Sequence, residues 1–412
     1  MINHICVLGL GRLGLPLAVS FAQVGLQVKG YDLDPKKVHD INAKCAPIQE
    51  PGLQAALQKT GPSLKATTDP QYAVLWTDAC IFVAPTPSLP DGSFDNHHLL
   101  DGIAAIAHAV SEQNRKSPYL FIITSTVTPG SCEKILLPAI QQHSANIQLV
   151  YKPELIALGT VLHDLAYPDV ALVGASNQQA AEEVASLYAR LSQVPGMRAN
   201  PIPPECKIMT FVEAELAKIS LNCAVTMKIS FANQVGMVAK QLGADPHVIL
   251  DFVGCDSRIG KKALKPGMPF SGLCYPRDNR MFQYVAKKAG ITAHLAAATD
   301  AINETMLKFI LAQVPADGDV GILGLTYKAG TAITEESAGM ALMTELRAMG
   351  RTVRVHDPLI MAEHLEEVLA CRTIVVTIDG AEYRGLQVKP GQFLIDPMRI
   401  TEKETLVRSA SK

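Results

Sequence analysis

Over about the first 190 residues, short hydrophobic runs alternate with stretches whose hydrophobic positions have helical spacing. The hydrophobic runs predict strands at residues 4–8, 27–31, 79–83, 120–124, 147–151 and 170–173. Helical spacing lies between most of them, as over residues 99–111 and 178–191. Because strands and helices alternate along the chain, we expect a parallel sheet with helices on both of its faces.

This alternation is interrupted at residues 195–204, where four prolines and one glycine mark the clearest domain boundary. Hydrophobic residues then recur at helical steps between Met209 and Gly243, and Gly236 is the one helix breaker between them. A helix of this length spans roughly 50 Å, which is more than one small domain requires. We expect it to join two domains or to pack on a partner subunit.

The strand and helix alternation returns from about residue 315. Further strands are expected at 320–325, 352–356, 373–378 and 393–395, and a helix at 340–349. The expected fold class is therefore α/β: two Rossmann-like, doubly wound domains joined by a long central helix and a helical middle domain. The expected domains are residues 1–195, 205–300 and 315–412.

The composition is that of a globular chain. Of the 412 residues, 48% are hydrophobic and 18% are charged, which excludes an intrinsically disordered protein. The net charge is −2, and no basic stripe carries interleaved aromatic residues, so nucleic-acid binding is not expected. Any anionic ligand must be held by a local cluster of cations.

The nine cysteines are scattered, odd in number and never spaced as Cys-x-x-Cys. This pattern excludes a disulfide framework and a structural zinc site, and no metal is expected. No run of 18 apolar residues and no secretory signal is visible, so we expect a cytoplasmic protein that does not insert into a membrane.

A dinucleotide-binding fingerprint follows the first expected strand. Gly9, Gly11 and Gly14 form a G-x-G-x-x-G turn that opens the helix beginning at Leu13. The glycines allow the tight turn, the approach of a pyrophosphate and close packing of helix on strand. Asp32 ends the second strand, where a carboxylate accepts hydrogen bonds from the adenosine ribose and repels a 2′-phosphate. We therefore expect the cofactor to be NAD rather than NADP.

Several downstream segments, read in order, resemble motifs of the UDP-glucose/GDP-mannose dehydrogenase family. They are residues 83–87 with 91–95, 125–130, 151–154, 214–222, 270–278, 324–328 and 356–358. The resemblance implies a four-electron oxidation in which a primary alcohol of a nucleotide sugar becomes a carboxylate, two NAD are reduced and a cysteine carries the intermediate. It also implies an NAD-binding first domain, a dimerising helical middle domain and a UDP-sugar-binding last domain, with a homodimer formed through the central helix.

The catalytic residues implied by the resemblance are Cys274, Lys218, Asn222, Asp278, Thr126 and Glu154. A thiolate is suited to this reaction, because it adds to an aldehyde and its adduct loses a hydride to give a thioester. Cys274 lies in a polar, breaker-rich stretch, unlike the other cysteines. Lys218 and Asn222 are four residues apart and share one helix face, where they would stabilise an oxyanion.

Binding residues are also implied by the resemblance. For the cofactor they are Pro85, Thr86, Thr126 and Arg277, added to the fingerprint residues Gly9, Gly11, Leu13, Gly14 and Asp32. For the UDP-sugar they are Glu154, Lys218, Asn222, Arg258, Gly272, Lys328 and Arg399. Arg258 begins an Arg-Ile-Gly sequence similar to the one in UDP-glucose dehydrogenases, where the arginine reaches the substrate of the adjacent subunit.

The chain departs from the family pattern at a few positions. Lys152 replaces an asparagine, Leu158 replaces an acidic residue and Glu335 replaces an arginine, while Ser271 and Leu273 replace a glycine and a serine beside Cys274. The charge reversal at 335 and the loss at 158 affect the expected cofactor side. These changes leave three consequences open: weaker NAD binding, an altered closed state or lost activity.

The leading hypothesis is oxidation of UDP-glucose to UDP-glucuronate. The alternatives are oxidation of a UDP-N-acetylhexosamine or of GDP-mannose, and a single-step hydroxyacid dehydrogenase, since that class also carries Lys-x-x-x-Asn on a helix after a Rossmann domain. A non-catalytic UDP-sugar binder is a further alternative, motivated by Leu158 and Glu335.

Overall fold

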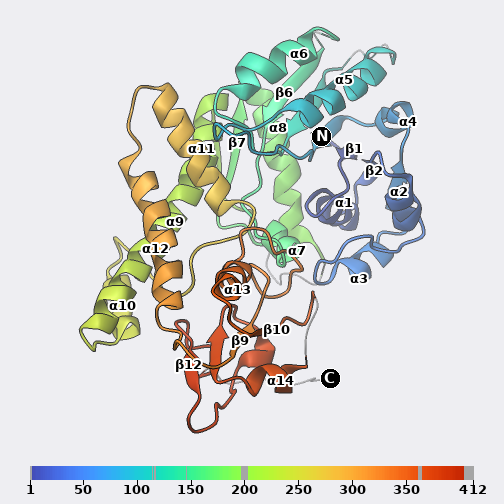
Figure 1. Ribbon diagram of the computed structural model, residues 1–412. Helices are drawn as coiled ribbons and strands as arrows, with labels where there is room; N and C mark the ends of the chain where they lie inside the picture. The colour runs from blue at the N-terminus through green and yellow to red at the C-terminus, as the bar shows by residue number, and fades with distance from the viewer. Residues whose placement is uncertain are drawn as a thin grey trace. The chain divides into compact units, whose positions relative to one another are not determined.

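A computed structural model describes residues 2–113, 115, 117–144, 146–195, 203–360 and 364–402 (Figure 1). The chain divides into two compact units, Met1–Ile219 and Ser220–Lys412. Each unit contains its own β-sheet. Among the described residues, none of the helices combines the length and the apolar character needed to cross a bilayer.

The first unit is built on an eight-stranded sheet with the strand order β3-β2-β1-β4-β5-β6-β7-β8. The strands are β1 His4–Leu8, β2 Gln27–Tyr31, β3 Leu64–Thr67, β4 Ala79–Phe82, β5 Tyr119–Ile123, β6 Ile147–Tyr151, β7 Ala171–Ala175 and β8 Cys206–Met209. All neighbours are parallel except β6 and β7. The expected parallel α/β sheet is confirmed apart from this one antiparallel pair, and β3 and β8 are additions to the expected strands.

Helices fill the connections of this sheet. They are α1 Gly14–Gln23, α2 Pro35–Asn42, α3 Leu53–Gln58, α4 Pro70–Val74, α5 His97–Ser111, α6 Leu137–Gln141, α7 Val161–Ala166 and α8 Gln178–Ala189, with a π-helix at Cys132–Leu136 and 3₁₀ turns at Gly61–Ser63 and Arg190–Gln193. Several start at sequence-encoded caps: the Asp34 carboxylate accepts from the backbone N–H of Lys36 at the start of α2, with Pro35 at the first helical position.

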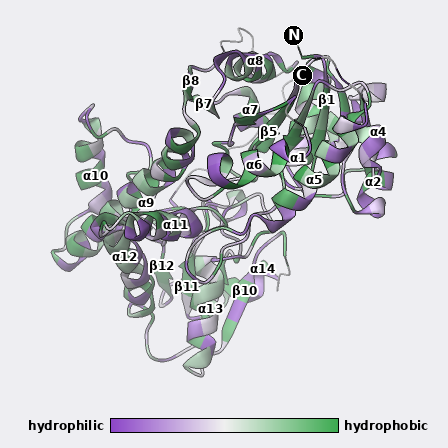
Figure 2. Cartoon of the chain, turned by 90° about the horizontal axis from the view of Figure 1, so that it is seen from above, coloured by the Kyte–Doolittle hydropathy of each residue, from purple (hydrophilic) through white to green (hydrophobic). Residues whose placement is uncertain are grey.

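Both faces of the large sheet are buried, which explains its continuously hydrophobic strands. Ile5 and Val7 of β1 belong to one hydrophobic cluster, whereas Cys6 and Leu8 belong to the other. Successive side chains of a strand point to opposite faces, so both sets of positions must be apolar. In Figure 2 these strands are coloured as hydrophobic, whereas α2 is coloured largely as hydrophilic.

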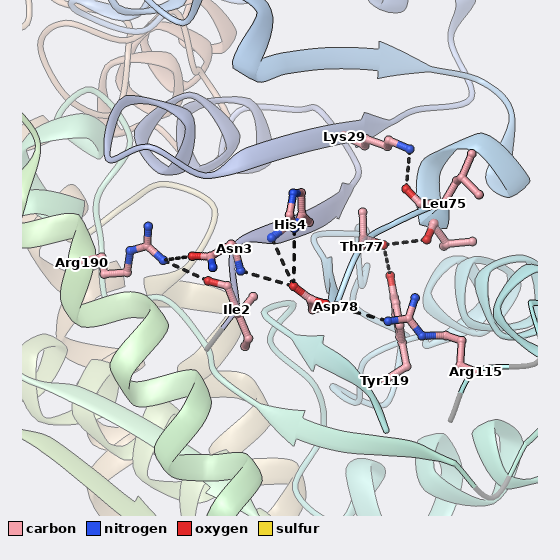
Figure 3. A network of polar contacts seen from close by, with 11 residues as sticks. Ile2, Asn3, His4, Lys29, Leu75, Thr77, Asp78, Arg115, Tyr119 and Arg190 are labelled. Carbon is pink, nitrogen blue, oxygen red and sulfur yellow. Dashed lines mark hydrogen bonds and ion pairs between the residues drawn. The ribbon is translucent and has the colours of Figure 1, made fainter. Parts of the chain in front are cut away.

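A polar network ties the amino-terminal segment to the sheet (Figure 3). The Asp78 carboxylate accepts from the backbone N–H groups of Asn3 and His4, each at 3.3 Å. Arg190 donates to the Ile2 carbonyl at 2.9 Å and to the Asn3 side chain at 3.2 Å. These contacts lie at the amino end of β1, so they fix the strand that carries the glycine-rich turn at its other end.

The second unit combines helices with a four-stranded parallel sheet of order β10-β9-β11-β12. Its strands are β9 Val320–Leu323, β10 Val353–His356, β11 Thr373–Val376 and β12 Phe393–Ile395. The helices are α10 Pro246–Cys255, α11 Tyr275–Lys288, α12 His294–Leu311, α13 Ala338–Ala348 and α14 Leu365–Leu369, with a 3₁₀ turn at Ala381–Tyr383. The long helix expected between residues 209 and 243 is α9, Phe211–Gln241, and the division between the units falls within it.

The same kind of turn joins a strand to a helix in each unit: β1 to α1 in the first, and β9 to α13 in the second. A Cβ atom at Gly14 would lie 1.8 Å from the Gly9 carbonyl oxygen, and one at Gly339 would lie 2.2 Å from that of Gly324. In the second unit the Asp357 carboxylate, after β10, accepts from the Leu325 backbone N–H at 2.8 Å. Both turns therefore require glycine where the helix meets the strand, as expected for two Rossmann-like folds.

Candidate active site

The glycine-rich turn lies at the carboxyl end of β1, where the strand order reverses between β1 and β4. Gly9 has φ +87°, and a Cβ there would collide with the Val83 carbonyl oxygen at 2.2 Å. A Cβ at Gly11 would meet no atom within 4 Å, so this backbone faces open space. Leu13 caps the start of α1, and Gly14 is its first residue. An open backbone at a helix N-terminus fits a pyrophosphate.

Asp32 lies directly after β2, beside this turn. Its Oδ2 atom accepts from the Leu10 backbone N–H at 2.9 Å and lies 3.5 Å from the Lys37 ammonium group. Its Oδ1 atom accepts from the Asp34 N–H at 3.0 Å. The carboxylate is thereby held in one orientation, as expected for a group that selects a ribose with two free hydroxyls.

The loops after β4 and β5 are joined through two predicted cofactor residues. The Thr86 hydroxyl donates to the Thr126 carbonyl at 2.7 Å, and the neighbouring Ser125 hydroxyl donates to the Ala84 carbonyl at 2.6 Å. Pro85, between them, is exposed. The structure thus brings Pro85, Thr86 and Thr126 together at the carboxyl edge of the sheet, where open α/β sheets bind ligands.

Glu154 follows β6 at the same edge, and its carboxylate forms an ion pair with Lys152. Lys152 Nζ lies 2.6 Å from Glu154 Oε2, and each side chain is only 7% exposed. Lys152 departs from the family pattern, and its pairing with Glu154 was not predicted from the sequence. Leu158, another departure, packs against the hydrophobic cluster that contains Ile5 and Val7 of β1.

Lys218 lies in the first third of α9 and is buried. One turn before it, the fully buried Glu215 carboxylate accepts from the backbone N–H groups of Gly130 and Cys132, at 2.5 and 2.8 Å. Burial raises the pKa of Glu215, and these N–H groups oppose that effect. Glu215 therefore attaches the loop after Thr126 to the helix that carries Lys218. The motif at 214–222 contains Glu215, but no role was predicted for this residue.

Cys274 immediately precedes α11, and its side chain is exposed. The partial positive charge at a helix N-terminus stabilises a thiolate. By contrast, burial raises the pKa of Cys80, Cys132, Cys206 and Cys223, the last to about 12, so these thiols stay protonated. The position of Cys274 suits a nucleophile.

Asn222 and Asp278 are brought together although 56 residues separate them. Asn222 Nδ2 donates to Asp278 Oδ2 at 2.6 Å. Asp278 lies in the first turn of α11 and is 1% exposed. Its Oδ1 atom accepts no hydrogen bond from the described residues and lies 3.6 Å from Arg277 Nε. One carboxylate oxygen is therefore fixed, while the other remains an acceptor.

A cavity of about 990 Å³ lies within the second unit, between α10, the segment before α11 and the loops after β9 and β11. It is lined by the predicted residues Lys328 and Arg399, and by Ser271 and Tyr275 on either side of Cys274. Gly272 packs on the Tyr327 ring, which also lines the cavity, and a Cβ there would lie 2.5 Å from the ring.

The lining carries more cations than the sequence analysis identified. Lys261, Lys265 and Arg384 join Lys328 and Arg399, against three carboxylates from Asp251, Asp379 and Glu402. Some cations pair with acids: Lys261 with Asp251 at 2.6 Å and Arg399 with Asp245 at 2.9 Å. A cationic lining fits a diphosphate. The lysines between residues 261 and 265, which follow a breaker-rich stretch, are the sequence signal from which part of this cationic lining could have been predicted.

Two charged residues that the sequence singled out, Arg258 and Glu335, do not line this cavity. Arg258 is 86% exposed, binds Asp256 at 2.6 Å and does not line the cavity. Glu335 accepts from the Thr334 backbone N–H at 3.1 Å. Its neighbour Glu336 instead pairs with Arg280 at 3.0 Å.

Models of the UDP-glucose/GDP-mannose dehydrogenase family match almost the whole chain: the NAD-binding domain at residues 3–192, the central domain at 212–305 and the UDP-binding domain at 321–402. The chain belongs to this family. It is a nucleotide-sugar dehydrogenase whose cofactor is NAD, as the fingerprint and Asp32 predict.

Individual relatives agree with this assignment. The UDP-glucose 6-dehydrogenase AglM of Haloferax volcanii is 31% identical over 375 residues, covering 88% of this chain and 85% of the relative. A UDP-glucose dehydrogenase from Pyrobaculum islandicum has a similar structure, with a TM-score of 0.88, 29% identity and coverage of 97% and 95%. A UDP-D-ManNAc dehydrogenase from Pyrococcus horikoshii follows with a TM-score of 0.83, 25% identity and coverage of 98% and 97%.

Proposed function

We propose that this chain oxidises the C6 alcohol of UDP-glucose to the carboxylate of UDP-glucuronate through a thioester on Cys274. One observation carries the proposal: a single unit holds an exposed cysteine at a helix start, a buried Asn222–Asp278 pair and a cation-lined cavity. The choice of UDP-glucose is supported by the relative AglM, which is named for that activity.

The chemistry divides among the proposed catalytic residues. NAD, when bound, supplies the hydride acceptor for each of the two oxidations. Lys218 and Asn222 stabilise the negative charge that develops on the C6 oxygen. Asp278, through Oδ1, accepts a proton at that oxygen or from water. Cys274 Sγ adds to the aldehyde carbon, and oxidation of this thiohemiacetal gives a thioester.

The remaining assignments are binding roles. Thr126 orients the reacting groups on the cofactor side, and Glu154 assists hydrolysis of the thioester. Gly9, Gly11, Leu13, Gly14 and Asp32, with Pro85, Thr86 and Arg277, hold NAD. Gly272, Lys328 and Arg399 hold the UDP-sugar, and Arg258, exposed in its own subunit, serves the partner subunit's substrate. The domain limits 1–195, 205–300 and 315–412 are proposed with these roles.

The reaction stoichiometry tests this function. With UDP-glucose in limiting amount, two NADH are expected per sugar and no free aldehyde, because the thiol adduct retains the intermediate. UDP-N-acetylmannosamine and GDP-mannose are assayed in parallel. A ratio of one NADH per sugar contradicts the thioester route, and a higher kcat/KM for another nucleotide sugar contradicts the substrate. UDP-sugar binding in calorimetry without NAD binding would instead identify a non-catalytic binder.

A homodimer through the central helices is part of the proposal. Large hydrophobic side chains are exposed at the end of α9 and along α10: Leu242 is 78% exposed, Val248 67% and Phe252 80%. Val248 and Phe252 are four residues apart and lie on one face of α10. Exposed apolar patches of this kind mark protein interfaces.

Replacing Phe252 by glutamate is expected to convert the dimer into a particle of 44.2 kDa in light scattering after gel filtration. A buried, unpaired carboxylate at an interface strongly opposes association. Met349→Glu, which alters a side chain 62% exposed in the turn after α13, is the control and should leave the mass unchanged. An unchanged mass for Phe252→Glu would place the interface elsewhere.

A further inference from the structure

Lys152 and Glu154 form a buried ion pair at the end of β6. The Lys152 backbone N–H donates to the Ile123 carbonyl at 2.8 Å, which extends the pairing of β6 with β5 by one residue. Its ammonium group lies 2.6 Å from Glu154 Oε2, and each of the two side chains is 7% exposed. At this burial neither charge is screened by solvent, so each depends on the other.

Lys152 also lies over an aromatic ring. Its Nζ atom is 4.1 Å from the ring centroid of Tyr188. Burial and the nearby Glu154 carboxylate hold the pKa of Tyr188 well above its usual range, so the ring stays neutral and presents its π face to the cation. Within the described part of the chain, Lys152 is the one cation paired with Glu154. The ammonium position is therefore defined from two sides.

The Glu154 carboxylate is satisfied at only one of its oxygens. Oε2 accepts from Lys152, whereas Oε1 is buried and accepts no hydrogen bond from the described residues. A buried acceptor without a donor costs free energy, and such atoms occur where a water or a ligand completes the site. The pair thus fixes one oxygen and leaves the other to take a proton.

We propose that Lys152 is a positioning residue that holds the Glu154 carboxylate in one orientation for hydrolysis of the thioester. This inference rests on the proposed function, in which Glu154 serves that step. Glu154 accepts a proton from water, the water oxygen bonds to the acyl carbon, and the C–S bond breaks with its electron pair returning to Cys274 sulfur. The acid product then ionises, and no electron transfer is involved.

A neutral residue at position 152 leaves the buried carboxylate without a counter-charge. Oε2 then loses the donor that holds it, so the carboxylate is no longer kept in the orientation that lets it take a proton from water. In the proposed function this carboxylate serves the hydrolysis step, so hydrolysis should slow more than the two oxidations. Replacement of Lys152 would therefore cause the acyl-enzyme to accumulate rather than cause a general loss of activity.

The test compares Lys152→Met with Lys152→Arg in rapid mixing with UDP-glucose and NAD. For Lys152→Met we expect a fast release of two NADH per active site, then steady turnover slower by about 100-fold, the scale of general base catalysis. Intact-protein mass spectrometry should show the UDP-uronyl adduct on Cys274. Lys152→Arg keeps the charge and should stay within a few fold of wild type. Lys207→Met, which alters an exposed pair with Glu205, is the matched control and should change nothing.

Variants made in the Glu154→Gln background separate effects on stability from effects on function. Glu154→Gln and Lys152→Met/Glu154→Gln should hydrolyse the thioester equally slowly, because Lys152 acts through Glu154. The double variant also lacks the unpaired charge, so it should melt above Lys152→Met.

Three results overturn the inference alone, provided that wild type forms two NADH per sugar. The first is wild-type turnover in Lys152→Met, and the second is a further slowing when Lys152→Met is added to Glu154→Gln. The third is loss of the first NADH release in a folded Lys152→Met. A wild-type protein that reduces NAD with none of the nucleotide sugars instead overturns the proposed function, and this inference with it.

Discussion

Cys274→Ser is expected to lower steady NADH formation from UDP-glucose by roughly 10³-fold or more. A serine hydroxyl is far less nucleophilic than a thiolate, so the aldehyde is not captured for the second oxidation. Any residual NADH should appear at one per sugar rather than two. The measurement is NADH yield and rate with limiting UDP-glucose.

The change should not disturb the fold, because the Cys274 side chain is exposed. Thermal melting of Cys274→Ser should therefore match wild type. Cys255, at the end of α10, is a second exposed cysteine of the same unit, and Cys255→Ser provides the control with full activity. Two NADH per sugar at a rate within tenfold of wild type in Cys274→Ser would rule out a covalent role for this sulfur.

Much of the larger sheet was predictable because its strands are buried on both faces. Such strands read as unbroken apolar runs, and β1, β2 and β6 lie at the residues expected. The short strands β3 and β8 escaped prediction because Leu64–Thr67 and Cys206–Met209 mix polar with apolar residues. The antiparallel direction of β7 was also beyond the sequence pattern, since alternation along a strand does not depend on its direction.

In the candidate site too, features that depend on local sequence were predictable, whereas features that depend on tertiary packing were not. The glycine-rich turn was predictable because its requirements are local: Gly9 needs positive φ, and Gly14 leaves no room for a Cβ. The pairing of Asn222 with Asp278 spans 56 residues and depends on how α11 packs, which spacing alone does not specify. Lys152 and Glu154 are close in sequence, but only tertiary burial makes their pairing consequential.

Asp278 and Asp300 offer a paired test of which carboxylate serves chemistry and which serves stability. Both belong to the second unit. The Asp300 oxygens accept from Asn279 and Gln283, each at 2.7 Å, whereas Asp278 Oδ1 accepts no hydrogen bond from the described residues. A fully bonded carboxylate stabilises a fold, while one that keeps an oxygen in reserve costs stability and suits a proton acceptor.

Asp278→Asn is therefore expected to lower kcat by about 10²- to 10⁴-fold, the contribution of a general base, without lowering the melting temperature. The amide can still accept from Asn222 Nδ2, but it cannot take a proton.

Asp300→Asn should do the opposite, because its amide NH₂ would face a donor; we expect about 1–3 kcal/mol lower stability and kcat within a few fold of wild type. Steady-state kinetics and thermal melts of both variants check the crossed outcome. If Asp278→Asn instead lost stability and kept its turnover, Asp278 would be a structural partner of Asn222, and the proton acceptor would have to be another group.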